Sequence, residues 1–148
     1  MNAYSKILVA VDLSPEAKQI IARAADIAER HGAQLALVHV VEPLITDGAY
    51  ELMPALPVEV ETTLVERAVQ FLERVADEAG MADTPREVRI GSVKREILAY
   101  AGELGCDLIV IGTHGRHGLA TLLGATANAI LHGTQCDVLC VRVGEREA

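Results

Sequence analysis

The chain reads Lys-Ile-Leu-Val-Ala-Val at residues 6–11, and Asp-Leu-Ser-Pro-Glu follows at residues 12–16. The continuous apolar run is typical of a strand that is buried on both faces of a parallel sheet. Ser14 is expected to cap a helix, because Pro15 suits the first helical position and Glu16 adds an acid to the first turn. The opening of the chain therefore predicts a strand that leads directly into a helix.

The same pattern recurs along the rest of the chain. Further strands are predicted at residues 34–41, 86–90, 107–111 and 137–143. Helices with apolar residues at three- and four-residue spacing are predicted from Ser14 to Gly32, from Val60 to Gly80, from Ser92 to Gly105 and over residues 119–131. Residues 42–56 are expected to form a surface loop. The alternation predicts an α/β fold, a single five-stranded parallel sheet with helices on both faces, in one domain over residues 1–148.

Composition narrows the classes of protein that this chain can be. Its 148 residues are 51% apolar, which is enough for a single domain to bury a core without disulfides or metals. The formal net charge of −8 disfavours nucleic acid as a partner. The apolar stretches are too short for membrane insertion, and the first residues lack a signal-peptide core. We therefore expect a soluble cytoplasmic protein.

The spacing of the cysteines and histidines favours neither a disulfide framework nor a metal site. Cys106, Cys136 and Cys140 lack the spacing of a disulfide framework, so reduced thiols are expected. His114 and His117 do not combine with these thiols into a zinc spacing, so no metal site is expected. His39, inside a predicted strand, is expected to be a hydrogen-bonded core residue.

A glycine-rich segment follows the fourth predicted strand and reads Gly-Thr-His-Gly-Arg-His-Gly-Leu-Ala-Thr-Leu-Leu-Gly-Ala-Thr at residues 112–126. Glycines let backbone N–H groups approach a ligand closely, and a following helix adds partial positive charge, so the segment suits a phosphate chain. The alternative is that Gly112 and Gly115 only form a tight turn, while Gly118 and Gly124 allow a helix to pack closely on the sheet. The spacing is neither the dinucleotide fingerprint nor the P-loop.

The glycine-rich segment resembles the nucleotide loop of the universal stress protein family, through Gly112-x2-Gly115 and Gly124-Ala125-Thr126. Residues 6–14, 37–40 and 137–141 resemble the first, second and last strands of that family, so the resemblance covers nearly the whole chain. It implies strand order 3-2-1-4-5, a Rossmann-like fold of the adenine nucleotide alpha hydrolase type. The first and fourth strands then meet at a switch point, where ligands bind in such sheets.

The resemblance also implies a site for ATP, or for AMP or ADP, in which Mg²⁺ can bind the phosphates. Ala10, Val11 and Asp12 would line the adenosine side, and the backbone of Val40 would meet the adenine edge. Asp12 has the alternative role of capping the first helix. The residues implied around the phosphates are Gly112, Thr113, His114, Gly115, Arg116, Gly118, Gly124, Ala125 and Thr126.

The spacing within this loop departs from that of the ATP-binding members. Eight residues separate Gly115 from Gly124 here, whereas those members usually have nine before a Gly-Ser/Thr pair. Either the loop is one residue shorter, or Ala125 replaces the glycine before Thr126.

The sequence leaves three functions open. The first is a regulatory protein whose nucleotide occupancy alters dimerisation or the binding of a protein partner, with slow ATP hydrolysis at most, since no general base is evident. The second is a nucleotide-free dimeric stress-response module. In both, the edge strand at residues 137–143 is expected to pair in a homodimer. The third, a nucleotidyl-transferring enzyme, is disfavoured because His114 and His117 follow the wrong strand and spacing.

Overall fold

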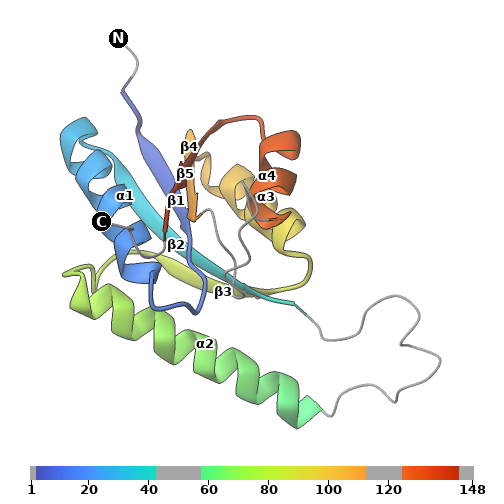
Figure 1. The fold of residues 1–148 in the computed structure, drawn as a ribbon. Coiled ribbons are helices and arrows are strands. Elements are labelled where there is room, and N and C mark those ends of the chain that lie inside the picture. Colours follow the sequence, from blue (N-terminus) through green and yellow to red (C-terminus); the bar gives the residue numbers. More distant parts are fainter. Residues whose placement is uncertain (1–2, 43–57, 113–124, 144–148) are drawn as a thin grey trace, which may run out of the picture.

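The computed structural model describes residues 3–42, 58–112 and 125–143. Strands and helices alternate along the described chain, as Figure 1 shows. The elements are β1 (Lys6–Ala10), α1 (Ala17–His31), β2 (Gln34–Val41), α2 (Val58–Glu78), β3 (Arg86–Ile90), α3 (Val93–Leu104), β4 (Leu108–Gly112), α4 (Ala125–Gly133) and β5 (Asp137–Val141).

The five strands form one sheet in the order β3-β2-β1-β4-β5, and every neighbouring pair is parallel. The central strand is β1, in which Leu8 lies opposite Ala36 of β2 and Ile109 of β4. The α/β prediction and the strand order implied by the family resemblance are both confirmed. Since β1 and β4 are neighbours whose chains continue to opposite sides of the sheet, their carboxyl ends form the switch point.

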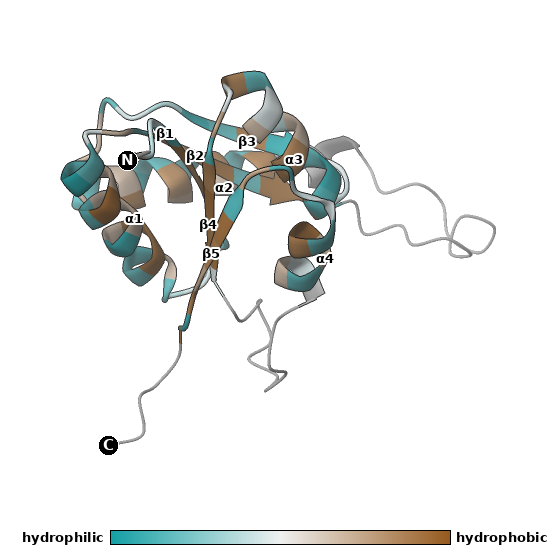
Figure 2. Ribbon diagram, turned by 90° about the horizontal axis from the view of Figure 1, so that it is seen from above, coloured by the Kyte–Doolittle hydropathy of each residue, from teal (hydrophilic) through white to brown (hydrophobic). Residues whose placement is uncertain are grey.

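Helices cover both faces of the sheet, and Figure 2 shows the apolar strands as a layer between them. Ile7 and Val9 of β1 pack with α1 and α2, whereas Leu8 packs on the opposite face with α3 and α4. All three side chains are fully buried. This explains why the strands read as continuous apolar runs: consecutive residues enter cores on opposite faces.

The predicted helix ends at Gly32, Ser92 and Gly105 are confirmed, and the predicted cap at Ser14 is wrong. Ser92 caps α3 by accepting a hydrogen bond from the Arg95 N–H, and Gly105 ends that helix in the left-handed conformation at φ 69°. Ser14 does not cap α1, because the capping position is Glu16 and no side chain bonds there. The Ser14 hydroxyl instead donates to Asp12.

The end of the chain also differs in detail from its prediction. Strand β5 stops at Val141, two residues before the predicted end, yet Val143 is only 5% exposed and packs in the core beside α1. In α4, Ala127 and Ile130 are buried as the helical spacing predicts, but Leu131 is 40% exposed. None of the helices in the described ranges is both long and apolar enough to span a membrane.

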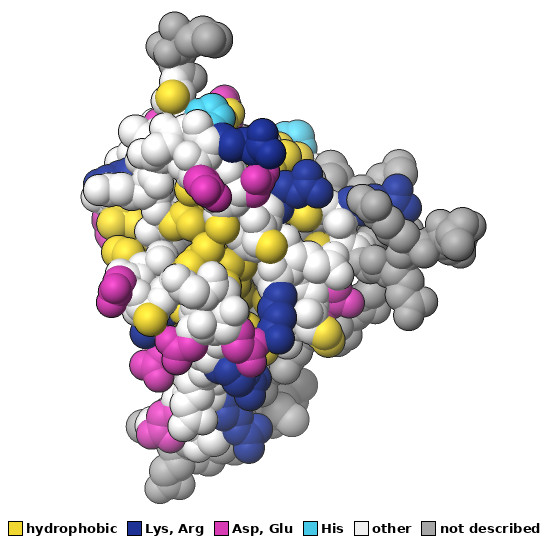
Figure 3. Space-filling view, turned by 90° about the vertical axis from the view of Figure 1, so that its left-hand side faces the viewer, with side chains coloured by type: hydrophobic (Ala, Val, Ile, Leu, Met, Phe, Trp, Pro, Cys, Tyr) yellow, Lys and Arg dark blue, Asp and Glu magenta, His cyan; other side chains and the backbone are white. Residues whose placement is uncertain are grey.

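The face drawn in Figure 3 has apolar side chains gathered at its centre and charged side chains of both signs around them. An ion pair between Lys18 of α1 and Glu78 of α2 joins the two helices that cover this side of the sheet. Both side chains are largely exposed, so the pair contributes little to stability.

Candidate functional site

The chain leaves the sheet just after β1, at Asp12. The Val11 N–H donates to the Val38 carbonyl at 2.8 Å, which continues the pairing of β1 with β2 one residue beyond the strand. The Val11 side chain is 3% exposed. Its carbonyl oxygen lies 2.7 Å from Nδ1 of His39, so β2 holds Val11 at both of its backbone polar groups. This confirms the prediction of a hydrogen-bonded histidine in β2.

The Asp12 carboxylate is oriented by the residue two positions further on. Its Oδ1 accepts hydrogen bonds from the Ser14 N–H at 3.2 Å and from the Ser14 hydroxyl at 2.5 Å. An aspartate that bonds the backbone two residues on forms an Asx turn. The Ser14 carbonyl in turn accepts from the Ala17 N–H, which starts α1. Asp12 therefore shapes the turn before the helix, and it does not cap the helix itself.

Five of the predicted site residues lie at the carboxyl edge of the sheet: Ala10, Val11, Asp12, Val40 and Gly112. The register pairs Ala10 with Val38 and Val9 with Val110. Val11 extends the pairing with β2 by one residue and Asp12 follows it, while Val40 and Gly112 lie within the last two residues of β2 and β4. Because ligands of doubly wound sheets bind in the crevice outside the carboxyl ends at the switch point, these residues border a candidate ligand site.

Gly112 has a packing reason that sequence reasoning missed. A Cβ atom placed there would lie 2.7 Å from Cδ1 of Ile20 and 3.7 Å from Cγ2 of Val143. Its φ is not among the positive values found for Gly32, Gly80 and other glycines, so no unusual backbone conformation requires it. Gly112 therefore has a packing role in place of the tight turn that was its alternative, and the phosphate interpretation rests on the residues that follow.

The rest of the predicted phosphate site is described only at its end. Thr113, His114, Gly115, Arg116, Gly118 and Gly124 lie outside the described residues. Helix α4 begins at Ala125, and Thr126 is exposed in its first turn. The glycine-rich segment therefore runs from the end of β4 to the N-terminus of a helix, the end that carries partial positive charge.

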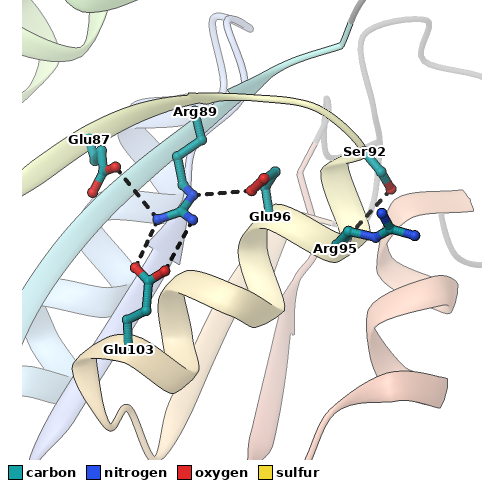
Figure 4. Close-up of polar contacts among 6 residues, drawn as sticks. All are labelled: Glu87, Arg89, Ser92, Arg95, Glu96 and Glu103. Atoms are coloured by element: carbon teal, nitrogen blue, oxygen red, sulfur yellow. Dashed lines mark hydrogen bonds and ion pairs between the residues drawn. The ribbon is translucent and has the colours of Figure 1, made fainter.

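A charge cluster at β3 was not predicted, and Figure 4 shows its members. The Arg89 guanidinium lies 2.9 Å from Glu103, 3.3 Å from Glu96 and 3.5 Å from Glu87, and it stacks 5.3 Å from the centre of the Tyr100 ring. The hydrogen bond to Glu103 raises the pKa of Arg89, although burial opposes the rise. The cluster ties edge strand β3 to α3, and no local pattern would pair Arg89 with Glu96 and Glu103 of that helix.

A second polar cluster lies at the opposite, amino-terminal edge of the sheet. The Asp107 carboxylate accepts hydrogen bonds from the Ser5 N–H, the Ser5 hydroxyl and the Lys6 N–H, at 2.9 to 3.2 Å. Burial raises the pKa of Asp107, but the bonds from Ser5 and Lys6 outweigh it and hold that pKa below its usual value. The Tyr4 hydroxyl donates to Asp137 at 2.8 Å, which raises the pKa of Tyr4. These contacts anchor the start of β1.

A pocket of about 380 Å³ also opens at this amino-terminal edge, between the starts of β1 and β2 and the end of α3. Its lining is mainly apolar, with Lys6 and Cys106 among its members. The Lys6 ammonium is already engaged by the Leu104 carbonyl at 3.0 Å. Since ligands of this sheet architecture bind at the carboxyl edge, this pocket is not the candidate site.

The strand order, with the Asp12–Ser14 turn at the switch point, defines a doubly wound α/β domain of the adenine nucleotide alpha hydrolase-like class. The sequence model of the universal stress protein family matches residues 3–142. The chain belongs to the universal stress protein family. It is 41% identical over 144 residues to universal stress protein A homolog 2 of Coxiella burnetii, a match that covers 97% of this chain and 98% of that protein. Homolog 1 of the same organism is 40% identical and is matched over 99% of its length.

Solved structures share the fold over almost the whole chain. The hypothetical protein MJ0577 superposes with a TM-score of 0.80 at 23% identity, over 98% of this chain and all of that one. The universal stress protein UspA from Lactobacillus plantarum gives 0.72 at 26% identity, over 96% and 100%. A universal stress protein in complex with cAMP gives 0.65 at 24% identity, over 95% and 98%.

Proposed function

We propose that this universal stress protein binds an adenine nucleotide, with ATP as the principal ligand, at the carboxyl edge of its sheet. The observation that carries the proposal is the Asp12 carboxylate, fixed by Ser14 at the switch point beside the strand that leads into the glycine-rich segment. A carboxylate placed there can accept hydrogen bonds from ribose hydroxyls. That a universal stress protein of the same fold forms a complex with cAMP supports an adenine nucleotide as the ligand class.

Different residues of the proposed site would contact different parts of the nucleotide. Ala10, Val11 and Asp12 would face the adenosine, and the backbone at Val40 would meet the adenine edge. Gly112, Thr113, His114, Gly115, Arg116, Gly118, Gly124, Ala125 and Thr126 would surround the phosphates. Among the described residues, no group of three or more His, Cys, Asp and Glu side chains could hold a metal ion. Mg²⁺ would enter mainly through the phosphates, as it commonly does.

The role we propose is regulation in the cytoplasm, where ATP is abundant. Nucleotide occupancy would change dimerisation or the binding of a regulatory protein partner, with slow hydrolysis at most. The dimer would form through β5, which lies at one edge of the sheet and whose outer backbone groups a second β5 could pair. This same position favours the second candidate function, a nucleotide-free dimeric module, which needs β5 but not Asp12.

The test begins with chromatography of any small molecule released from the purified protein. The emptied protein is then titrated calorimetrically with Mg-ATP, beside the variants Asp12→Ala and Gly115→Arg. Asp26→Ala is the matched control, because Asp26 is a carboxylate on α1 that pairs with Arg30 away from the carboxyl edge. Micromolar binding that both site variants lose and the control retains would support the proposal. No binding by a folded dimer would favour the nucleotide-free module.

The regulatory part needs a separate measurement. Sedimentation velocity of the emptied protein, with and without saturating Mg-ATP, reports whether nucleotide changes the dimer. An unchanged dimer in the presence of bound ATP would remove the link to dimerisation and leave a protein partner as the regulated interaction.

A further inference from the structure

The His39 imidazole joins β2 to the corner where β1 leaves the sheet. Its Nδ1 lies 2.7 Å from the Val11 carbonyl oxygen. A carbonyl oxygen can only accept a hydrogen bond, so Nδ1 must carry the proton. The register that pairs Ala10 with Val38 places His39 beside Val11, which is why its side chain can reach that carbonyl.

This bond acts on the peptide group that leads to Asp12. The Val11 carbonyl belongs to the peptide between Val11 and Asp12, so its direction fixes the plane from which the Asp12 side chain departs. The preceding peptide is held separately, because the Val11 N–H donates to Val38. On the far side, Ser14 holds the Asp12 carboxylate. One contact holds the peptide that precedes Asp12, and the other holds its carboxylate.

We propose that His39 is a positioning residue of the nucleotide site: its Nδ1–H holds the Val11 carbonyl and so aims the Asp12 carboxylate at the ligand. The inference rests on the proposed nucleotide binding and deepens it, since it names a residue that does not touch the ligand. The competing view is that His39 only stabilises the sheet, and the two views differ in what a substitution does to affinity.

The sequence allows a matched pair of variants. In His39→Asn, the side-chain amide nitrogen stands as many bonds from Cα as Nδ1 does, so it can donate to the Val11 carbonyl. His39→Leu has a similar volume and no donor. Loss of the hydrogen bond to the Val11 carbonyl should weaken Mg-ATP binding by about three- to tenfold in His39→Leu. His39→Asn should bind within about twofold of the unaltered protein.

Two measurements keep the inference separate from the proposed function. Long-range ¹H–¹⁵N correlation spectra of the emptied protein report the tautomer of His39, and amide spectra report whether the Asp12 and Ser14 signals move in His39→Leu but are retained in His39→Asn. Calorimetric titration of the three proteins with Mg-ATP then gives the affinities, with thermal unfolding to confirm that each is folded.

The outcomes are distinct. Nδ1 protonation, Asp12 signals that move only in the leucine variant, and affinity rescued by asparagine support the positioning role. A neutral ring protonated at Nε2, or equal affinities in both variants, overturns it. If the unaltered protein does not bind Mg-ATP, nucleotide binding fails, and the spectra alone decide whether His39 sets the Asp12 backbone.

Discussion

A side chain on Gly112 would collide with Ile20, since its Cβ would lie 2.7 Å from Cδ1 of that residue. Ile20 is 1% exposed, so it has little room to move within the core. We expect Gly112→Ala to lower the free energy of unfolding by about 1–3 kcal/mol, the usual cost of overpacking. Urea unfolding followed by circular dichroism measures the change.

Gly102 in α3 is the matched control, because a Cβ there would meet nothing within 4 Å. Gly102→Ala should stabilise the protein by about 0.5–1 kcal/mol, since alanine reduces the freedom of the unfolded chain. Equal effects of the two substitutions would show that the contact with Ile20 does not set the need for glycine at 112.

Asp107 should make stability depend on acid pH. Hydrogen bonds from Ser5 and Lys6 outweigh burial and hold its pKa below the usual value, so the carboxylate stabilises the fold above the unfolded-state pKa. That contribution is lost as the pH falls through the lower, folded-state pKa. Asp107→Asn should lower the free energy of unfolding by about 1 kcal/mol at pH 7. The free energy of unfolding of this variant should then fall less steeply between roughly pH 5 and pH 2 than that of the unaltered protein.

The control for Asp107 is Asp26→Asn, which changes a carboxylate in an exposed pair with Arg30 and should shift stability by less than about 0.5 kcal/mol. Urea unfolding across this pH range compares both variants with the unaltered protein. An acid dependence in Asp107→Asn as steep as in the unaltered protein would contradict the assignment.

Arg89 should matter more than an ordinary surface arginine. Its side chain is 17% exposed, and its removal would leave Glu87, Glu96 and Glu103 close together without a cation. After allowance for the exposure of Glu87 and Glu103, we expect Arg89→Met to destabilise the protein by about 1–2 kcal/mol.

Arg30→Met is the comparison, since Arg30 is 74% exposed in its pair with Asp26 and should contribute less than about 0.5 kcal/mol. Thermal unfolding at low and high salt separates the two, because salt should also narrow the gap between Arg89→Met and the unaltered protein. Equal losses in the two methionine variants would mean that the Arg89 cluster is only a set of surface contacts.

Cys106 should be a poor nucleophile in the folded protein. Burial, reinforced by the neighbouring Cys136, raises its pKa to about 11. At pH 8 its alkylation should be slower by on the order of a hundredfold than in the urea-unfolded chain, because only the thiolate reacts. The raised pKa also means that its contribution to stability is present below the unfolded-state pKa and fades as the pH rises through the folded-state pKa.

Alkylation with iodoacetamide, quenched over time and mapped by peptide mass spectrometry, gives the rate for Cys106 separately from the other thiols. The native rate should rise steeply between pH 8 and pH 10. Fast, pH-independent labelling of Cys106 in the folded protein would contradict a partly buried, protonated thiol.

Local sequence determined the elements of this fold. Continuous apolar runs such as residues 6–11 specify strands that are buried on both faces. Ser92 and Gly105 specify the two ends of α3. Each of these signals acts over only a few residues. The glycine-rich segment, together with the strand motifs, indicated the family. The predicted cap at Ser14 is wrong for an equally local reason: Asp12, two residues earlier, accepts the hydrogen bond of the Ser14 hydroxyl.

Tertiary structure decided what the individual residues do. His39 reaches Val11 across 28 positions of the chain, and Asp107 reaches Ser5 across 102. The space for a side chain at position 112 is limited by Ile20, on a helix near the start of the chain. Partners of this kind are chosen by the register of parallel strands and by the packing of helices on the sheet, which no short window of sequence contains. The sequence alone therefore determined the elements and the family, and only the packed sheet decided which side chains meet at its carboxyl edge.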